Sequence, residues 1–309
     1  MVDIHVQTPV FHMNSVRRFT GKSVYLKMEC FQPVGSFKIR GVGLLSQRAL
    51  EAGVTHLVSS SGGNAGYAVA YAGRKLGIKV TVVVPSTTPE AVRQKIELMG
   101  ASVQVHGSVW DEAHQYALQL SEGKKTICVN PFDDPLLWEG HGTIIDEAVK
   151  QCEKPDVIIL SVGGGGLLCG VLEGLHRNNW RDIPVIAVET EGAASLYKSV
   201  SAGRLITLDE VKTVASSLGA KQVASQAFKW TQNHQVIPHL VTDAAAVGAC
   251  LKFADDYRVL VEPACGASLS LAYDIPTVIR AFKTVLIVVC GGIGGSIESF
   301  RRWKKDLML

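Results

Sequence analysis

The most reactive feature of the sequence is a lysine flanked by small residues. Lys38 lies within the stretch Gly35-Ser36-Phe37-Lys38-Ile39-Arg40-Gly41, directly after the large apolar side chain of Phe37. Most lysines are solvated surface charges, but a lysine held against apolar surface loses hydration, which favours the neutral amine. Because the neutral amine attacks carbonyl carbons, Lys38 is a candidate nucleophile that forms a Schiff base with a carbonyl compound.

Two glycine-rich stretches each follow an expected strand and open an expected helix. Six of the eight residues in 59–66 are serine or glycine, and residues 163–166 are four consecutive glycines. Bare backbone at a helix N-terminus presents N–H groups to an anion. An ordinary turn capped by Asn64 remains an alternative for the first stretch, whereas the four glycines would weaken the structure unless a ligand requires bare backbone. Neither nucleotide-binding pattern, G-x-x-x-x-G-K-[ST] or G-x-G-x-x-G, fits, so a phosphate monoester is favoured.

Two apolar strands end in residues that could take part in a functional site. Cys290 ends an apolar strand and precedes a third glycine-rich run, although a cysteine in that place is about as often a small core residue. Glu189 ends another apolar strand, where an unpaired carboxylate is costly, so we expect it to have a cationic partner. The nine histidines show no metal-ligand spacing, and none is assigned a catalytic role.

The elements that must position these residues alternate between strand and helix. Strands are predicted at residues 23–29, 55–59, 79–84, 102–106, 126–129, 157–161, 185–189 and 285–290. Helices are predicted at residues 39–50, 64–76, 89–99, 110–120, 140–151, 166–177, 243–257 and 264–273, with a last helix from residue 296. The pattern in residues 190–241 is unclear. Such alternation indicates mostly parallel sheets with helices on both faces.

Composition excludes several classes of protein. The 309 residues carry a net charge of only +3 from scattered basic residues, which argues against a nucleic-acid surface. The seven cysteines lie far apart without a C-x-x-C pair, which argues against disulfides or zinc and favours a reducing compartment. The longest apolar runs have the length of strands, and the N-terminus has no signal pattern. We therefore expect a soluble cytoplasmic protein with no membrane or nucleic-acid partner.

Five motifs in order resemble one enzyme family. They are G-S-F-K-x-R-G (35–41), S-S-x-G-N-A-G (60–66), S-V-G-G-G-G-L (161–167), E-P-A-C-G-A (262–267) and V-x-C-G-G (288–292). Together they resemble the catabolic L-serine/L-threonine dehydratases, pyridoxal-phosphate (PLP) enzymes of the tryptophan-synthase-β-like fold (fold type II). The resemblance implies a two-lobed α/β architecture in which each lobe is a mostly parallel twisted sheet flanked by helices. It also implies a large PLP-binding domain of residues 1–38 plus 131–309 and a small substrate-side domain of residues 39–130.

The resemblance also implies a role for individual residues. Lys38 would be the catalytic residue, joined to the cofactor in the resting enzyme and taking the Cα proton as general base. The cofactor-binding residues would be Phe37, Lys38, Asn64, Gly163, Gly164, Gly165, Gly166, Leu167, Ser217 and Cys290. The substrate carboxylate would be held by Ser61, Gly62, Asn64 and Ala65. A potassium-like cation would be held by Gly163, Glu189, Ala193, Leu218 and Ala220.

The resemblance also implies which part of the cofactor each of these residues would contact. Phe37 and Ser217 would approach the two faces of the cofactor ring, Asn64 its hydroxyl, and Cys290 its pyridine nitrogen. The glycines at 163–166 and Leu167 would hold the phosphate. The implied reaction is β-elimination from L-serine to pyruvate and ammonia, and from L-threonine to 2-oxobutanoate and ammonia, by a homodimer.

Two other functions are weighed against this one. A serine racemase with dehydratase side activity needs a second base, for which Ser217 could serve, but Ala65 stands where a racemase-type loop has histidine. A catalytically weak fold-type-II protein could instead bind or regulate. The retention of Lys38, Asn64 and the four glycines argues against that alternative, because a binding module would not need the Schiff-base lysine.

Overall fold

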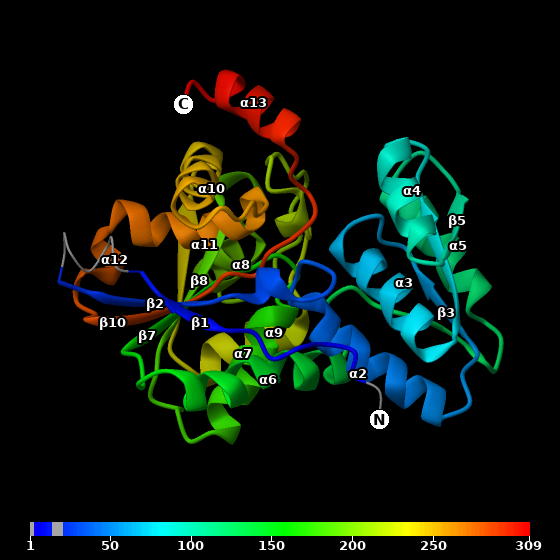
Figure 1. Cartoon of the computed structure of the whole chain (residues 1–309), viewed down its shortest axis with the longest axis horizontal. Coiled ribbons are helices and arrows are strands. Elements are labelled where there is room, and N and C mark those ends of the chain that lie inside the picture. The colour runs from blue at the N-terminus through cyan, green and yellow to red at the C-terminus, as the bar shows by residue number, and fades with distance from the viewer. Residues whose placement is uncertain (1–2, 14–20) are drawn as a thin grey trace.

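The computed structural model describes residues 3–13 and 21–309, which form two separate β-sheets (Figure 1). The larger sheet has six strands in the order β1-β2-β10-β7-β8-β9. They are β1 (Val10–His12), β2 (Ser23–Lys27), β10 (Thr284–Val288), β7 (Val157–Ser161), β8 (Val185–Thr190) and β9 (Val236–Val241). All neighbouring strands are parallel except β1 and β2, which are antiparallel.

The smaller sheet has four parallel strands in the order β5-β4-β3-β6. They are β5 (Ser102–Val105), β4 (Lys79–Val84), β3 (His56–Ser59) and β6 (Thr126–Cys128). Successive side chains of β3 point to opposite faces of the sheet. Leu57 accordingly joins the main core, while Val58 packs with Ala113 and Ala117 of the helix on the other face.

Helices cover both faces of each sheet (Figure 1). The larger helices are α2 (Lys38–Glu51), α3 (Asn64–Leu76), α4 (Glu90–Leu98), α5 (Trp110–Leu120), α6 (Pro135–Gln151), α7 (Gly166–Arg177), α8 (Ser195–Ala202), α9 (Ser225–Asn233), α10 (Asp243–Tyr257), α11 (Pro263–Asp274) and α13 (Ile297–Asp306). Short turns of helix are η1 (Glu29–Phe31), η2 (Glu191–Ala193), η3 (Ser216–Leu218) and α12 (Thr277–Arg280). α10 and α11 lie on one side of the larger sheet, and α6 and α7 lie on the other (Figure 1). The predicted fold class, two mostly parallel sheets flanked by helices, is confirmed.

Two of the differences from the prediction have identifiable reasons. α6 begins at Pro135, five residues before the predicted start at residue 140, because the Asp134 carboxylate accepts from the Leu136 N–H at 2.8 Å and proline suits the first helical position. β9 was not predicted, since Pro238 lies in its middle. β9 is an edge strand, where a missing N–H is tolerated.

The two sheets are built from different parts of the chain. Residues 56–128 supply the smaller sheet, and the flanking parts supply the larger one. This arrangement supports the predicted domain boundaries at residues 38 and 130. That the two parts are separate domains stays a prediction. Residues 1–2 and 14–20 of the predicted large domain lie outside the described part of the chain.

Parallel strands bring the candidate residues to one edge of each sheet. The Lys38 segment follows β2, Cys290 follows β10, and the four glycines follow β7, all at carboxyl ends of the larger sheet. Residues 60–66 follow β3 in the smaller sheet. Open parallel sheets bind ligands outside the carboxyl ends of their strands. No helix in residues 3–13 and 21–309 is long and apolar enough to cross a bilayer.

Candidate active site

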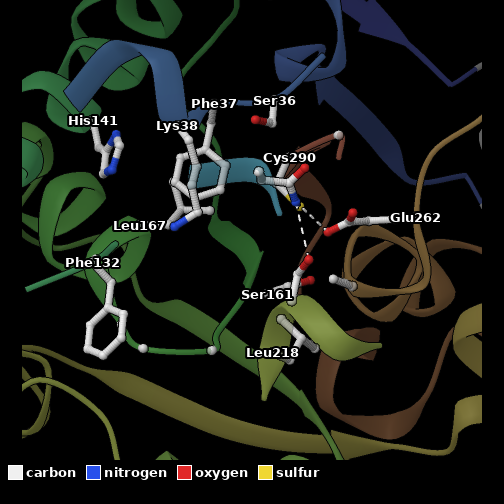
Figure 2. A pocket seen from close by; sticks show the side chains of 18 residues that line it. Ser36, Phe37, Lys38, Phe132, His141, Ser161, Leu167, Leu218, Glu262 and Cys290 are labelled. Atoms are coloured by element: carbon white, nitrogen blue, oxygen red, sulfur yellow. Dashed lines mark hydrogen bonds between the residues drawn. The ribbon is translucent and has the colours of Figure 1, made fainter. Parts of the chain in front are cut away.

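A pocket between the two sheets brings all ten predicted cofactor-binding residues together (Figure 2). They are Phe37, Lys38, Asn64, Gly163, Gly164, Gly165, Gly166, Leu167, Ser217 and Cys290. His141, Glu262 and Phe132 also line the pocket. In Figure 2 His141 lies to the left of Lys38 and Phe37, while Cys290 and Glu262 lie to the right. The proximity is thus observed, and the role of each residue stays a proposal.

Lys38 is the first residue of α2, and its exposed part borders the pocket. Its Nζ donates to the carbonyl oxygen of Pro131 at 2.6 Å and lies 5.4 Å from the centroid of the Phe37 ring. Burial lowers the pKa of Lys38 to about 8, and the negative charge of Glu262 opposes part of that shift. The neutral amine is therefore accessible near neutral pH, as the sequence predicts.

The arginine of the same motif anchors the start of α2. The Arg40 guanidinium is fully buried and bonds Glu29 of η1 (Nε to Oε2, 2.6 Å) and Glu147 of α6 (Nη1 to Oε1, 2.7 Å). Lys27 of β2 also bonds Glu147, at 2.5 Å. Two cations and two carboxylates thus neutralise one another in the core, a cluster in which the loss of one partner is costly. The cluster holds Lys38 in place from three neighbouring elements.

The four glycines are packed so closely that side chains would collide. An added Cβ at Gly164 would lie 2.1 Å from the Phe132 ring, and one at Gly166 would lie 2.6 Å from the Phe132 carbonyl oxygen. Gly165 has φ +90°, which favours glycine. No side chain caps α7, which begins at Gly166. Its first N–H groups are therefore available to an anion in the pocket.

The predicted substrate residues line a wider pocket that adjoins the first. Ser61, Gly62, Asn64 and Ala65 border it together with Lys38. Asn64 and Ala65 begin α3 and the other two residues precede it; the N-terminus of α3 also has no side-chain cap. Asn64 is the first residue of α3 and is not its cap, so its side chain is free for other bonds. The ordinary capped turn is thereby excluded for this stretch.

The residues predicted to bind a cation are only partly gathered at the pocket. Gly163 and Leu218 line the first pocket and Ala220 lines the second, whereas Glu189 and Ala193 border neither. The Glu189 carboxylate accepts from the N–H groups of Leu196 and Tyr197, at 2.8 and 2.7 Å. Burial raises the pKa of Glu189 to about 7, and these N–H groups oppose the shift. Among the described residues, the partners of this carboxylate are backbone N–H groups at the start of α8, and the expected cationic partner stays a prediction.

Three pocket residues escaped the sequence analysis. His141 is buried, lies edge-on to Phe37 at 4.8 Å between ring centroids, and has no hydrogen-bond partner for Nδ1 within residues 3–13 and 21–309. Burial holds its pKa well below the usual value. Glu262 was read only as part of a motif, and Phe132 was given no role. A carboxylate directly before the proline that begins α11 was the one signal for Glu262.

The chain matches the family model "pyridoxal-phosphate dependent enzyme" over residues 2–291. It is a member of that family. The chain is 47% identical over 314 residues to the L-serine dehydratase of Dictyostelium discoideum, a match that covers 95% of this chain and 90% of the relative. It is 44% identical to the human L-serine dehydratase/L-threonine deaminase, with 98% and 96% covered. The structure of a fungal L-serine ammonia-lyase from Rhizomucor miehei superimposes with a TM-score of 0.93 at 38% identity and covers 98% of each chain.

These comparisons confirm the predicted family and fold. The pocket also fits PLP, the cofactor of that family. PLP has a carbonyl group for a lysine amine and a phosphate for a helix N-terminus. The pocket offers the buried Lys38 amine and the glycine cradle at the start of α7. Nδ1 of His141 is a further polar atom that has no partner in the part of the chain that the structure describes.

We expect PLP to combine with the cofactor-free protein faster as the pH rises through about 8. The Lys38 amine, whose pKa is lowered to about 8, is protonated and unreactive below that pH and neutral above it. The rate is measured by absorbance from about pH 6.5 to 9.5. An isolated lysine derivative with an ordinary pKa serves as control and corrects for the cofactor's own titration. A corrected rate that follows the control, with no midpoint near pH 8, would contradict this account of Lys38.

Proposed function

We propose that this protein is a PLP-dependent ammonia-lyase that acts on L-serine and L-threonine by β-elimination. The products are pyruvate and ammonia from serine, and 2-oxobutanoate and ammonia from threonine. The observation that carries the proposal is the convergence of Lys38 with two uncapped helix N-termini, those of α7 and α3. The similarity to L-serine dehydratases over nearly the whole chain supports the same activity.

Different groups in the pocket would carry out different parts of this reaction. The bound cofactor supplies an electron sink that makes the Cα hydrogen of the amino acid acidic. The N–H groups at the start of α7 hold a phosphate, and those at the start of α3 hold the substrate carboxylate. Lys38 then takes the Cα proton, because its lowered pKa leaves the amine neutral in a useful fraction of molecules.

The direct test is a product assay on the purified protein. With L-serine we expect pyruvate and ammonia in equal amounts, and with L-threonine we expect 2-oxobutanoate and ammonia. Chiral analysis of the remaining serine is made on the same samples. Accumulation of D-serine in excess of pyruvate would favour the racemase instead, and cofactor binding with no product from either amino acid would favour a binding or regulatory protein.

Cys290 is expected to favour elimination over racemisation. A thiol is a weak donor, so a pyridine nitrogen beside Cys290 stays largely unprotonated and the ring is a poorer electron sink. Racemisation and transamination need a longer-lived carbanion than elimination does. We therefore expect Cys290→Asp, which would favour the protonated nitrogen, to lower the ratio of pyruvate to D-serine and transamination products.

A control variant distinguishes an effect on the pyridine nitrogen from an effect on core packing. Cys290 is buried and borders Cys265, so Asp also costs stability. Cys290→Ser places another small, weak donor at the same position and should keep the ratio near that of the natural protein. A folded Cys290→Asp protein with an unchanged ratio would show that this residue does not tune the ring.

We also propose a monovalent cation, of the size of K⁺, beside the phosphate cradle. Glu189 would hold it with carbonyl groups of Gly163, Ala193, Leu218 and Ala220. The support is a buried carboxylate with no Lys or Arg partner among the described residues, and a Gly163 backbone packed against Ser217 and Leu218. A cation there would offset the cost of burying Glu189.

Turnover and PLP affinity in potassium are compared with those in a bulky organic cation at equal ionic strength. We expect both to fall several-fold in the bulky cation. Equal turnover and equal affinity in the two salts would exclude the cation site.

The cytoplasmic location and the homodimer are proposed on the resemblance to the dehydratase family alone, and the dimer is tested by light scattering.

A further inference from the structure

The glycine run after β10 leaves room for a buried carboxylate. Gly292 has φ +120°, and an added Cβ there would lie 2.0 Å from Cδ of Glu262. At Gly294 an added Cβ would lie 2.7 Å from Oε2 of the same side chain. Glu262 itself is only 3% exposed. The third glycine-rich stretch of the sequence therefore accommodates Glu262, while the cradle after β7 faces the phosphate.

The hydrogen bonds of Glu262 define the orientation of the Asn64 amide. Oε1 of Glu262 accepts from Nδ2 of Asn64 at 2.8 Å, and Oε2 accepts from the N–H of Gly294 at 2.7 Å. Oδ1 of Asn64 accepts from the N–H of Ile293 at 2.8 Å. A carboxylate can only accept and a backbone N–H can only donate, so the amide nitrogen must face Glu262 and the amide oxygen must face Ile293.

This orientation turns one amide hydrogen of Asn64 toward the pocket, where Ser217 accepts it. Nδ2 of Asn64 carries two hydrogens, and Glu262 takes one of them. Nδ2 donates the other to Oγ of Ser217 at 3.2 Å, and Ser217 lines the pocket together with Asn64. A flipped amide would instead present an acceptor to the pocket. The cofactor ring bears a hydroxyl oxygen that favours a donor when it is ionised, so the observed orientation is the useful one.

The same bonds join the two sheets across the pocket. Asn64 begins α3, directly after β3 of the smaller sheet. Glu262 precedes α11, which packs on the larger sheet, and Ile293 follows β10 of that sheet. The partners are 198 and 229 residues apart in sequence. Figure 2 shows the bond to Glu262 at the end of the pocket near Cys290.

We propose that Glu262 is a positioning residue that fixes the Asn64 amide with an N–H toward the cofactor and fastens the two sheets together at the pocket. The proposal rests on cofactor binding in this pocket. In this role Glu262 acts through Asn64 and takes no part in the reaction itself.

The test uses an isosteric exchange of donors and acceptors. Glu262→Gln replaces one acceptor by an NH₂ group, which must face either the Asn64 NH₂ or the Gly294 N–H. Asn64→Asp places a second carboxylate opposite that of Glu262, so that two acceptors face each other. The double variant Asn64→Asp with Glu262→Gln restores a donor opposite every acceptor, because the glutamine NH₂ can donate to the aspartate while its oxygen accepts from Gly294. Leu271→Val, in the buried part of α11, controls for general destabilisation.

Two quantities are measured on the full-length protein: thermal unfolding with and without PLP, and the dissociation constant of PLP. We expect Glu262→Gln to weaken PLP binding about tenfold, because a buried donor is left facing a donor. Each single variant should lower the melting temperature, and the double variant should recover most of the loss. The double variant should not recover PLP affinity, because a carboxylate then faces the cofactor. Leu271→Val should lower the melting temperature and leave PLP affinity unchanged.

Two results would overturn the proposal. One is a double variant that is no more stable than the sum of the single effects, which would show that Asn64 and Glu262 are not coupled. The other is Glu262→Gln with natural PLP affinity, or with a loss no larger than that of Leu271→Val. A natural protein that binds no PLP would instead refute the proposed function, while the stability coupling would still be measurable without cofactor.

Discussion

Replacing Lys38 by alanine should abolish elimination almost completely while the protein remains folded. The general-base step alone accounts for a factor of about 10²–10⁴, and the variant also loses the amine that joins the cofactor. We therefore expect turnover of L-serine to fall by about a thousandfold or more. The fold should survive, because the Arg40 cluster anchors α2 independently and the Lys38 amine has one bond to protein, to the Pro131 carbonyl.

Two companion variants make the Lys38 result specific. Lys38→Arg keeps a cation beside Pro131 but cannot form the link to the cofactor, so it should be as inactive as Lys38→Ala. Lys79→Ala, at the exposed start of β4, should retain natural activity. Turnover is measured by pyruvate release, and folding by thermal unfolding. A Lys38→Ala protein that still turns over serine at a tenth of the natural rate would refute the assignment.

Adding one methyl group to the phosphate cradle should have the second largest effect. In Gly166→Ala the new Cβ would lie 2.6 Å from the Phe132 carbonyl oxygen and 3.0 Å from its Cα, so the start of α7 must move away from that backbone. Overpacking of this kind costs about 1–3 kcal/mol, and the N–H groups that hold the phosphate move with the helix. We expect PLP affinity to fall at least tenfold and turnover at subsaturating cofactor to fall with it.

A second helical glycine provides the matched control. Gly248 lies within α10, and an added Cβ would meet no atom within 4 Å. Gly248→Ala should therefore raise stability by about 0.5–1 kcal/mol through helix propensity and leave PLP affinity unchanged. Both affinities are measured by titration of the cofactor absorbance. Equal affinity in the two variants would mean that the start of α7 does not hold the phosphate.

The parts of the site that could be predicted are those with an unusual local composition. Lys38 and the four glycines stand out within a few residues of sequence, and the strand and helix periods around them are local as well. The two sheets follow from that alternation. β9 was missed because Pro238 obscures its pattern, and its place at the sheet edge depends on strands far away in the chain.

The parts that could not be predicted depend on contacts between distant residues. The bond between Asn64 and Glu262 joins positions 198 apart, so neither residue reveals the other. The start of α8 supplies backbone N–H donors to Glu189 that no pattern of side chains could indicate. His141 borders the pocket because α6 packs between α2 and α7, which only the folded chain shows.

The central claim is that Lys38 carries the cofactor in this pocket. Borohydride makes the link between a lysine amine and the carbonyl carbon of PLP permanent, and peptide mass spectrometry then locates the modified residue. The account predicts one cofactor per chain, attached to the peptide that contains Lys38, and no attachment in Lys38→Arg. Attachment to a different lysine, or reduction that leaves the Lys38 peptide unmodified in a protein with bound cofactor, would contradict it.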